Sequence, residues 1–314
     1  MHPLLLSSPR IQSYGAALLL AWGICWWVAR RRARSFGIPS WHIDWLVPLL
    51  IVSTALGTRL AGKLCQMLSD GNANDRVLFG GLIMATGAAV VCAAVVRIPL
   101  GRLGDAFAFS LPLSIAALRI GCFCAGCCWG DICVNPERLA VVDDQAWRRQ
   151  VQTMPRISNE HWPVRVSFPA GSPAYYQHLT AGLLPQGVDR SLPVHPVQLY
   201  ELAGSLALFG VLLLVDRRLR RWGESFLLFA VGYCVIRFVI EWFRADNQLL
   251  VYDLTFSQLT GAACACVCVL VWSVRIVLAK RTPDSYNRPN ARVHTNSVTP
   301  GMATSSGGGA ASQV

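Results

Sequence analysis

Residues 118–131 read LRIGCFCAGCCWGD and residues 195–201 read HPVQLYE, and each stretch lies at the edge of an apolar segment. Their polar side chains fall where a lipid bilayer would normally exclude them. A charged side chain at the bilayer centre costs at least about 2.5 kcal/mol unless it is paired or hydrated, so such residues usually line a functional cavity. We therefore predict a polar site inside a membrane protein, built from Arg119, His195, Gln198 and Glu201.

The composition around these stretches is that of an integral membrane protein. Of the 314 residues, 54% are hydrophobic and 14% are charged, against about 25% charged residues in soluble domains. Apolar stretches close to the length of a membrane-spanning helix recur along the chain. They predict an all-α integral membrane fold within residues 1–281, with about seven transmembrane helices near 13–29, 42–62, 77–96, 103–124, 196–215, 225–243 and 255–279.

Basic residues between these stretches indicate the orientation. If seven helices alternate, the basic clusters all fall on one side, which the positive-inside rule assigns to the cytoplasm. The N-terminus is then outside and the C-terminus cytoplasmic. A cleaved signal peptide is not expected, because the first basic cluster follows the first apolar stretch. The clusters hold much of the net charge of +11, so nucleic-acid binding is not expected. They comprise Arg30, Arg31, Arg32, Arg34, Arg97, Arg102, Arg217, Arg218, Arg220, Arg221, Lys280 and Arg281.

Two polar segments depart from this helical pattern. Residues 130–194 are rich in Pro, Gly, Trp and charge, and they are too long for a simple connection. We expect them to form an extracytoplasmic loop domain within the membrane fold. Residues 282–314 are dominated by Ser, Thr, Asn and Gly, which predicts a disordered cytoplasmic tail.

Five of the 12 cysteines cluster near the outer end of the fourth apolar stretch, at Cys122, Cys124, Cys127, Cys128 and Cys133. Their spacing matches no zinc ribbon or ferredoxin pattern closely. Close helix packing by small residues is the favoured interpretation. An outward-facing disulfide and a metal or redox site are the alternatives. We expect no metal and no cofactor.

The sixth stretch carries Arg237, Glu241 and Arg244, spaced four and then three residues apart, which predicts that they share one helical face. In lipid that face must turn inward, where Glu241 can neutralise one arginine while the other binds an anion. Arg119 and Arg59 add cations from the fourth and second stretches. Arginines from three helices suit a phosphate better than a neutral substrate. A purely structural ion network is the alternative.

On these motifs the chain resembles the bacterial prolipoprotein diacylglyceryl transferases. The resemblance implies transfer of a diacylglyceryl group from phosphatidylglycerol to the lipobox cysteine of prolipoproteins, in the bacterial inner membrane. HPVQLYE is the most specific of the matching pieces, which run in the family's order from about residue 2 to residue 250. The pieces are HPLLL at 2–6, SYG at 13–15, GTRLAG at 57–62, FGGL at 79–82, Asp105 before Pro112, LRIGCF at 118–123, HPVQLYE at 195–201 and RFVIEWFRADNQ at 237–248.

The resemblance also implies roles for individual residues. A thiolate must displace glycerol phosphate from a lipid carbon, so Arg119 and Arg237 are candidates for stabilising the departing phosphate. Tyr14 could instead serve as an anchor at the membrane interface. His195 could instead cap the fifth helix or order the outer loop. The expected catalytic residues are Tyr14, Arg119, His195, Arg237 and Glu241. The expected substrate-binding residues are Arg59, Gly80, Gly81, Gly121, Gly130, Gln198, Tyr200, Glu201 and Arg244.

Four positions, in three motifs, depart from the family pattern. Phe79 stands where the family's HGGL motif has its histidine, Leu118 and Cys122 replace the Gly and Asn of GRIGNF, and Cys127 replaces a Glu. Without that histidine, the base would be His195, Glu201, Glu241 or water. The alternatives to a transferase are a relative that uses another acceptor or thiol redox chemistry, and a non-enzymatic lipid-binding protein.

Overall fold

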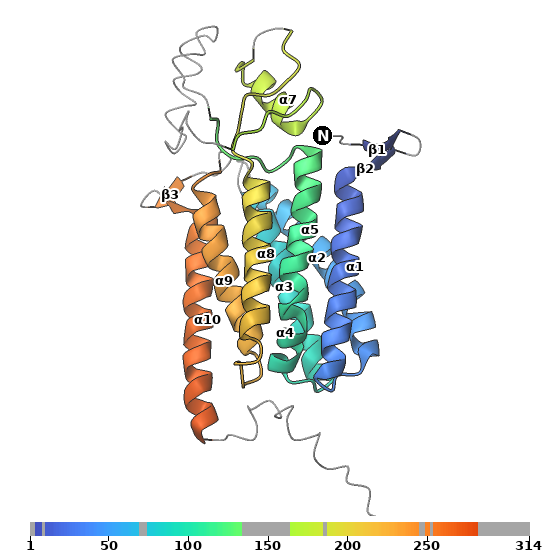
Figure 1. Cartoon of the computed structure of the whole chain (residues 1–314), viewed down its shortest axis with the longest axis vertical. Coiled ribbons are helices and arrows are strands. Elements are labelled where there is room, and N and C mark those ends of the chain that lie inside the picture. The colour runs from blue at the N-terminus through green and yellow to red at the C-terminus, as the bar shows by residue number, and fades with distance from the viewer. Residues whose placement is uncertain are drawn as a thin grey trace, which may run out of the picture.

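A computed structural model describes residues 4–7, 10–68, 74–133, 164–184, 187–244, 249–251 and 254–281. Long helices run side by side along the longest axis, and α7 lies beyond one end of them (Figure 1). The predicted tail, 282–314, and residues 134–163 of the predicted loop domain lie outside the described residues. The helices are α1 (Ser13–Ser35), α2 (Ser40–Leu68), α3 (Asn74–Val95), α4 (Leu100–Ala108), α5 (Ser110–Ala125), α7 (Pro173–Thr180), α8 (Val197–Val215), α9 (Glu224–Glu241) and α10 (Phe256–Arg281).

Two short antiparallel hairpins accompany the helices in the described part of the chain. The first pairs β1 (Leu4–Ser7) with β2 (Arg10–Gln12) directly before α1. The second pairs β3 (Leu249–Val251) with β4 (Leu254–Thr255) directly before α10. Each hairpin therefore sits at the start of a long helix, and in Figure 1 both lie toward the end of the bundle where α7 is found.

Three of the described helices are long and apolar enough to cross a membrane: Ser40–Leu64, Val197–Val215 and Phe256–Leu278. The bent pair α4 and α5 gives a fourth candidate. The fold is thus mostly helical with three or four candidate spans, and the count of seven stays a prediction. Two other long helices carry more charge, since α1 ends in an arginine-rich segment and the 18 residues of α9 include Glu224, Arg237 and Glu241, whereas Phe79–Val95 of α3 is apolar but shorter.

The fourth predicted helix is broken at Phe109, where α4 meets α5 at an angle of 40°. Pro112 explains the break. A proline lacks an N–H group, and its ring clashes with the carbonyl four residues earlier, which here belongs to Ala108. The break separates a short helix from the α5 segment that carries Arg119.

Glycines allow the helices to approach one another closely. A Cβ on Gly80 would overlap Ala61 of α2, and one on Gly81 would lie 2.7 Å from Thr58 Cγ2 on the same helix. A Cβ on Gly121 of α5 would overlap Ala17 of α1. These three predicted substrate-binding glycines therefore lie in helix contacts, where small residues let backbones meet.

The end of the bundle opposite α7 is rich in arginine. Arg32 Nη2 lies 2.9 Å from Asp216 Oδ2, and Arg30 Nε lies 3.1 Å from Asp44 Oδ1. Asp105 is fully buried and accepts hydrogen bonds from the amides of Gly223 (2.7 Å) and Phe226 (3.2 Å). This carboxylate thereby satisfies N–H groups at the start of α9, which have no partners within the helix.

Residues beyond the α5 end pack into a small unit with its own core. Ile132 and Val166 both bridge to Val194, and Pro169 bridges to Arg190. The buried apolar side chains of this unit are Ile132, Phe168, Ala174, Leu183, Leu184, Leu192 and Val194. The described part of the predicted loop domain is therefore ordered around α7. Its placement outside the cytoplasm stays a prediction.

Candidate functional site

Four charged side chains from three helices form one ion network. Arg119 Nη2 of α5 lies 2.8 Å from Glu201 Oε1 of α8, and Arg237 Nη1 of α9 lies 3.2 Å from Glu201 Oε2. The second nitrogen of Arg237, Nη2, lies 3.1 Å from Glu241 Oε2. Both carboxylates are almost completely buried. Glu241 thus pairs with one arginine, as the spacing predicted, and Glu201 links that arginine to Arg119.

Neutral hydroxyl groups complete the coordination of the two carboxylates. Tyr233 donates a hydrogen bond to Glu201 Oε1 at 2.9 Å, and Thr255 donates one to Glu241 Oε1 at 3.1 Å. The sequence reasoning missed both residues. Tyr233 could have been found, because it precedes Arg237 by one helical turn on α9. Thr255 carries no comparable signal, since it lies on β4 beyond a loop.

Arg244 does not lie on the helical face predicted for it. The α9 helix ends at Glu241, and the next two residues turn away from the helix axis. Arg244 instead bridges to Gly130 as an isolated antiparallel pair, and its side chain is buried. The spacing rule fails here because it holds only while the helix continues.

The segment after α5 is tied to the start of α8 through backbone hydrogen bonds. Gly130 donates to the His195 carbonyl at 2.9 Å, and the His195 amide donates to the Asp131 carbonyl at 2.9 Å. The N-cap residue of α8 is Pro196, which directly follows His195. His195 is fully buried, with Nδ1 3.4 Å from the Tyr200 hydroxyl. The backbone of His195 thus joins the segment after α5 to the start of α8, and the role of its side chain stays a prediction.

Gly130 occupies a position where no side chain fits. A Cβ there would overlap Phe243 O and Val197 Cγ2, and it would lie 2.8 Å from His195 Cβ. Three chain segments thus meet at Gly130. This close approach brings the predicted substrate-binding glycine beside the aromatic cluster of His195, Tyr200 and Phe243, whose ring centroids lie 5.5–6.3 Å apart.

The other predicted residues lie at different distances from the network. Gln198 is fully buried and donates from Nε2 to the Cys127 carbonyl at 2.7 Å. The Tyr14 hydroxyl is within electrostatic range of Arg119 and three cysteine thiols. Arg59 is exposed on α2, and among the described residues no ion pair joins it to the network. Of the arginines predicted on three helices, Arg119 of α5 and Arg237 of α9 therefore belong to the network, and Arg59 of α2 does not.

Phe79, which stands in place of the family's histidine, lies on α3. Its ring packs edge-on against Phe256 of α10, with the centroids 5.2 Å apart. Phe256 directly follows Thr255, which binds Glu241. The phenyl ring therefore lies near the Glu241 end of the network, separated from it by one aromatic contact.

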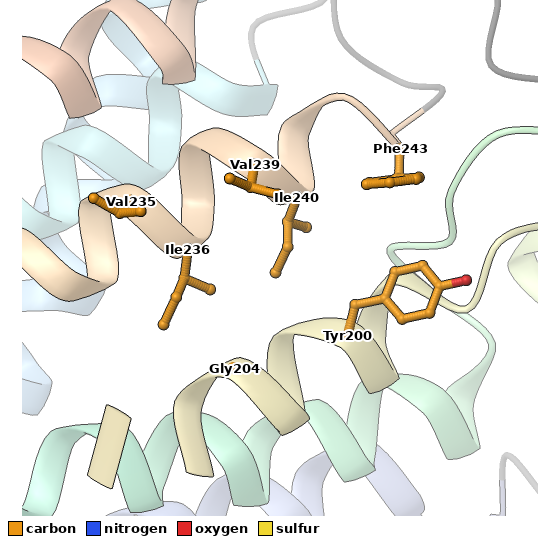
Figure 2. A pocket seen from close by; sticks show the side chains of 7 residues that line it. All are labelled: Tyr200, Gly204, Val235, Ile236, Val239, Ile240 and Phe243. Carbon is orange, nitrogen blue, oxygen red and sulfur yellow. The ribbon is translucent and has the colours of Figure 1, made fainter. Parts of the chain in front are cut away.

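An apolar groove opens between α8 and α9 beside the network. Its volume is about 380 Å³, and Ile236 and Ile240 of α9 point across it toward Tyr200 and Gly204 of α8 (Figure 2). Its lining residues are Tyr200, Gly204, Val235, Ile236, Val239, Ile240 and Phe243. None of these lining residues is charged, although Glu201 and Arg237 of the network are the sequence neighbours of Tyr200 and Ile236 on the same two helices.

Three thiols converge at the end of α5. The sulfur atoms of Cys122, Cys127 and Cys128 all lie within 4.8 Å of one another, and none of the three is in a disulfide. Arg119 Nη1 approaches Cys122 Sγ at 3.9 Å. The cluster therefore adjoins the ion network directly.

Asp131 is a buried carboxyl group that the sequence reasoning missed. Burial raises the pKa of Asp131 to about 6 from its ordinary value of 3.8. Between these values the folded protein holds a proton that the unfolded chain has lost. The stabilisation from this carboxyl is therefore present below about pH 4 and is lost as the pH rises through about 6.

We expect Asp131→Asn to raise the unfolding temperature at pH 7.5, because the amide carries no charge to bury. The gain corresponds to at most about 3 kcal/mol and should vanish near pH 4, where Asp131 is protonated in both states. Thermal unfolding in detergent at both pH values measures it. Asp189→Asn, at an exposed position, is the control. An equal gain at pH 4 and 7.5 would contradict the assignment.

Comparison with known proteins identifies the family of the chain. The sequence profile of prolipoprotein diacylglyceryl transferase matches residues 3–274. The chain belongs to this family. A relative from Symbiobacterium thermophilum, named phosphatidylglycerol–prolipoprotein diacylglyceryl transferase, is 27% identical over 282 residues, covering 84% of this chain and 89% of its own.

Two further relatives carry the same name. The protein from Pseudomonas paraeruginosa is 28% identical over 287 residues, covering 85% of this chain and 90% of its own. The one from Burkholderia cenocepacia is 31% identical over 179 residues, which is 54% of each chain. Together with the apolar helices, family membership makes this chain a multi-pass protein of the bacterial inner membrane.

Proposed function

We propose that this protein transfers a diacylglyceryl group from phosphatidylglycerol to the lipobox cysteine of prolipoproteins. The observation that carries the proposal is the guanidinium of Arg119. Its Nη2 is held by Glu201, and its Nε is buried without a hydrogen-bond partner among the described residues, a feature that it shares with Arg30, Arg32 and Arg102 but combines with a place in the Glu201 network. A buried donor of this kind is costly unless an acceptor completes it. A phosphate oxygen is such an acceptor, and arginine binds phosphate at two points.

The charge of the site also fits a phosphodiester. Arg119 and Arg237 balance Glu201 and Glu241, and the buried Arg244 adds one positive charge near the end of α9. The lipid phosphate carries a single negative charge. Arg119 would contact it, and Arg237 would hold Glu201 in place, because both of its terminal nitrogens already bind carboxylates.

The apolar groove between α8 and α9 supplies the place for an acyl chain. Its lining is aliphatic apart from Tyr200 and Phe243, and it lies on the same helices as Glu201 and Arg237. Apolar cavities with few polar groups at one end are typical of sites for amphipathic ligands.

The reaction follows from these positions. The acceptor thiolate forms a bond to the glyceryl carbon, whose C–O bond to the phosphate breaks, and glycerol phosphate departs with that electron pair. Donors aimed at the departing phosphate stabilise the charge that it gains. Arg119 is the residue placed to do so.

The first test uses arginine-to-lysine variants. Lysine keeps the charge and loses the planar fork, so we expect Arg119→Lys and Arg237→Lys to lower transfer about a hundredfold. Transfer of labelled diacylglyceryl from phosphatidylglycerol to a lipobox peptide is the measurement. Arg32→Lys is the matched control, because Arg32 is also a half-buried helical arginine in an ion pair, at the opposite end of the bundle. It should keep near wild-type activity.

Two results would count against the proposal. Unchanged transfer in both site variants would remove the phosphate role from the network. Transfer that is absent in the wild type and present in Phe79→His would favour the alternative of a lipid-binding relative without activity, because an imidazole restores the missing proton acceptor.

We also propose seven membrane-spanning segments, counting α4 and α5 as one, with the α7 unit outside and the C-terminus in the cytoplasm. The arginine-rich end of α1 and the C-terminal end of α8, which the basic residues 217–221 follow, lie at the end opposite α7 in Figure 1, as the positive-inside rule requires. Reporter fusions at exposed residues of 173–180 should read extracytoplasmic, and fusions after Arg281 cytoplasmic. The opposite pair of readings would reject this orientation.

A further inference from the structure

We propose that Cys122, Cys127 and Cys128 bind one zinc ion and leave a fourth position for the acceptor thiol. The inference rests on the proposed transferase function for the identity of that thiol, and on geometry alone for the metal. It departs from the packing role that the cysteine pattern favoured. It also supplies the step that the loss of the family's histidine at Phe79 leaves open, namely formation of the acceptor thiolate.

The spacing of the sulfur atoms fits one cation. Zinc binds thiolate sulfur at about 2.3 Å in a tetrahedron, so two sulfur ligands of one ion lie about 3.8 Å apart. The three sulfurs lie within 4.8 Å of one another before any ligand draws them together. Small rotations of the side chains are enough to close that difference. Thiolate ligands also select zinc over the harder cations calcium and magnesium.

The backbone is built to bring these thiols together. The α5 helix ends at Gly126 in the left-handed conformation, with φ 69°, and the Cys127 amide donates back to the Cys122 carbonyl at 3.1 Å. Cys128 has φ 58°, which a residue with a side chain rarely adopts. The chain therefore reverses at this point and returns two thiols over the third. Packing alone does not require a cysteine in that strained position.

Neighbouring groups hold the turn and balance its charge. Gln198, fully buried on α8, fixes the Cys127 carbonyl with a hydrogen bond of 2.7 Å. Three thiolates and a divalent cation carry one net negative charge. The Arg119 guanidinium approaches Cys122 Sγ and therefore lies next to this charge.

The role of the site follows from its three ligands. Zinc with three protein ligands keeps an open coordination position, and a thiol that binds there loses its proton. That proton passes to solvent, and the bound sulfur is then the nucleophile for the glyceryl carbon. Arg119 lies 3.9 Å from Cys122 Sγ, so the acceptor sulfur would be next to the residue that binds the phosphate.

The first experiment measures zinc in the full-length protein purified in detergent. We expect about one zinc per chain in the wild type, and less than about a tenth of that in Cys122→Ser, Cys127→Ser and Cys128→Ser. Cys124→Ser is the matched control, because Cys124 is half-buried on the same helix and lies outside the cluster. It should keep the zinc. Equal metal content in all variants, or none in zinc-supplemented wild type, would overturn the site.

A second measurement needs no variant. Zinc should protect the three cluster thiols of the wild type against iodoacetamide and leave the reactivity of Cys124 unchanged, as read by mass spectrometry of each cysteine. A chelator should remove the protection. Equal alkylation with and without zinc would reject the site even if the serine variants fail to fold.

The open position is tested with cobalt in place of zinc. A lipobox peptide should change the cobalt absorption spectrum, and the same peptide with serine at its cysteine should not. No change with either peptide would reject acceptor binding at the metal. Metal binding without transferase activity would reject the proposed function and keep the metal site. Full transfer by the three serine variants would reject the metal's part in the reaction and keep the proposed function.

Discussion

Glu201→Gln should lower diacylglyceryl transfer by at least a factor of about 100, which corresponds to about 2.7 kcal/mol in the transition state. The carboxylate binds Arg119 at 2.8 Å and Arg237 at 3.2 Å. An amide cannot neutralise two guanidinium groups, so the two arginines would repel each other and move from the phosphate position. Removing one partner of a buried ion pair also costs about 3–5 kcal/mol of stability. Transfer assays and thermal unfolding in detergent measure the two effects.

Glu224→Gln separates this result from the loss of any buried glutamate. Glu224 is also buried, on α9, and it accepts hydrogen bonds from the amides of Arg220 (2.9 Å) and Arg221 (3.0 Å) at the other end of the bundle. Its replacement should lower stability by about 1 kcal/mol and leave transfer within about twofold of the wild type. Similar activity losses in both variants would show that Glu201 matters only for the fold.

Gly130→Ala is the second substitution with a large expected effect. The added methyl would overlap Phe243 O and the Val197 side chain, which belong to two other segments. Overpacking of this kind costs about 1–3 kcal/mol, and here the backbone must move to relieve it. The movement would separate His195 from the α5 end. We expect a lower unfolding temperature and transfer reduced by about tenfold to a hundredfold.

Gly210→Ala provides the matched control for that variant. Gly210 lies on α8, and a Cβ there would meet no atom within 4 Å. Alanine is the better helix former by about 1 kcal/mol, so this variant should be as stable as the wild type or more stable. Wild-type transfer by Gly130→Ala would contradict the close-approach role of that glycine.

The helices were the part of the fold that the sequence could predict. The stretch 196–215 is helical from Val197 to Val215, and 255–279 lies within α10 apart from its first residue. Apolar runs define helices because only backbone groups satisfied within the segment are tolerated in lipid. The break at Phe109 was not predicted, although Pro112 carried its signal. The break was missed because the apolar residues continue without interruption across the bend between α4 and α5.

The candidate site was predicted in its members but not in its contacts. Arg119 and Glu201 were both named, yet nothing in the sequence pairs two residues that lie 82 positions apart. Tertiary packing decides such a pair. The convergence of Cys127 and Cys128 on Cys122 depends on a left-handed residue at position 128, which the pattern of cysteines does not contain.

The two ion pairs of the network, Arg237 with Glu241 and Arg119 with Glu201, become complete at different times during synthesis of the chain. Arg237 meets Glu241 four residues along the same helix, so α9 can leave the translocon with that charge already paired. Arg119 enters with α5, and its partner Glu201 is synthesised 82 residues later, after roughly ten seconds of translation. An unpaired arginine at the helix centre costs about 2.5–3.5 kcal/mol in the membrane. Insertion of α5 before α8 would therefore carry this cost, and the pairing of Arg119 with Glu201 favours the association of the two helices in the membrane.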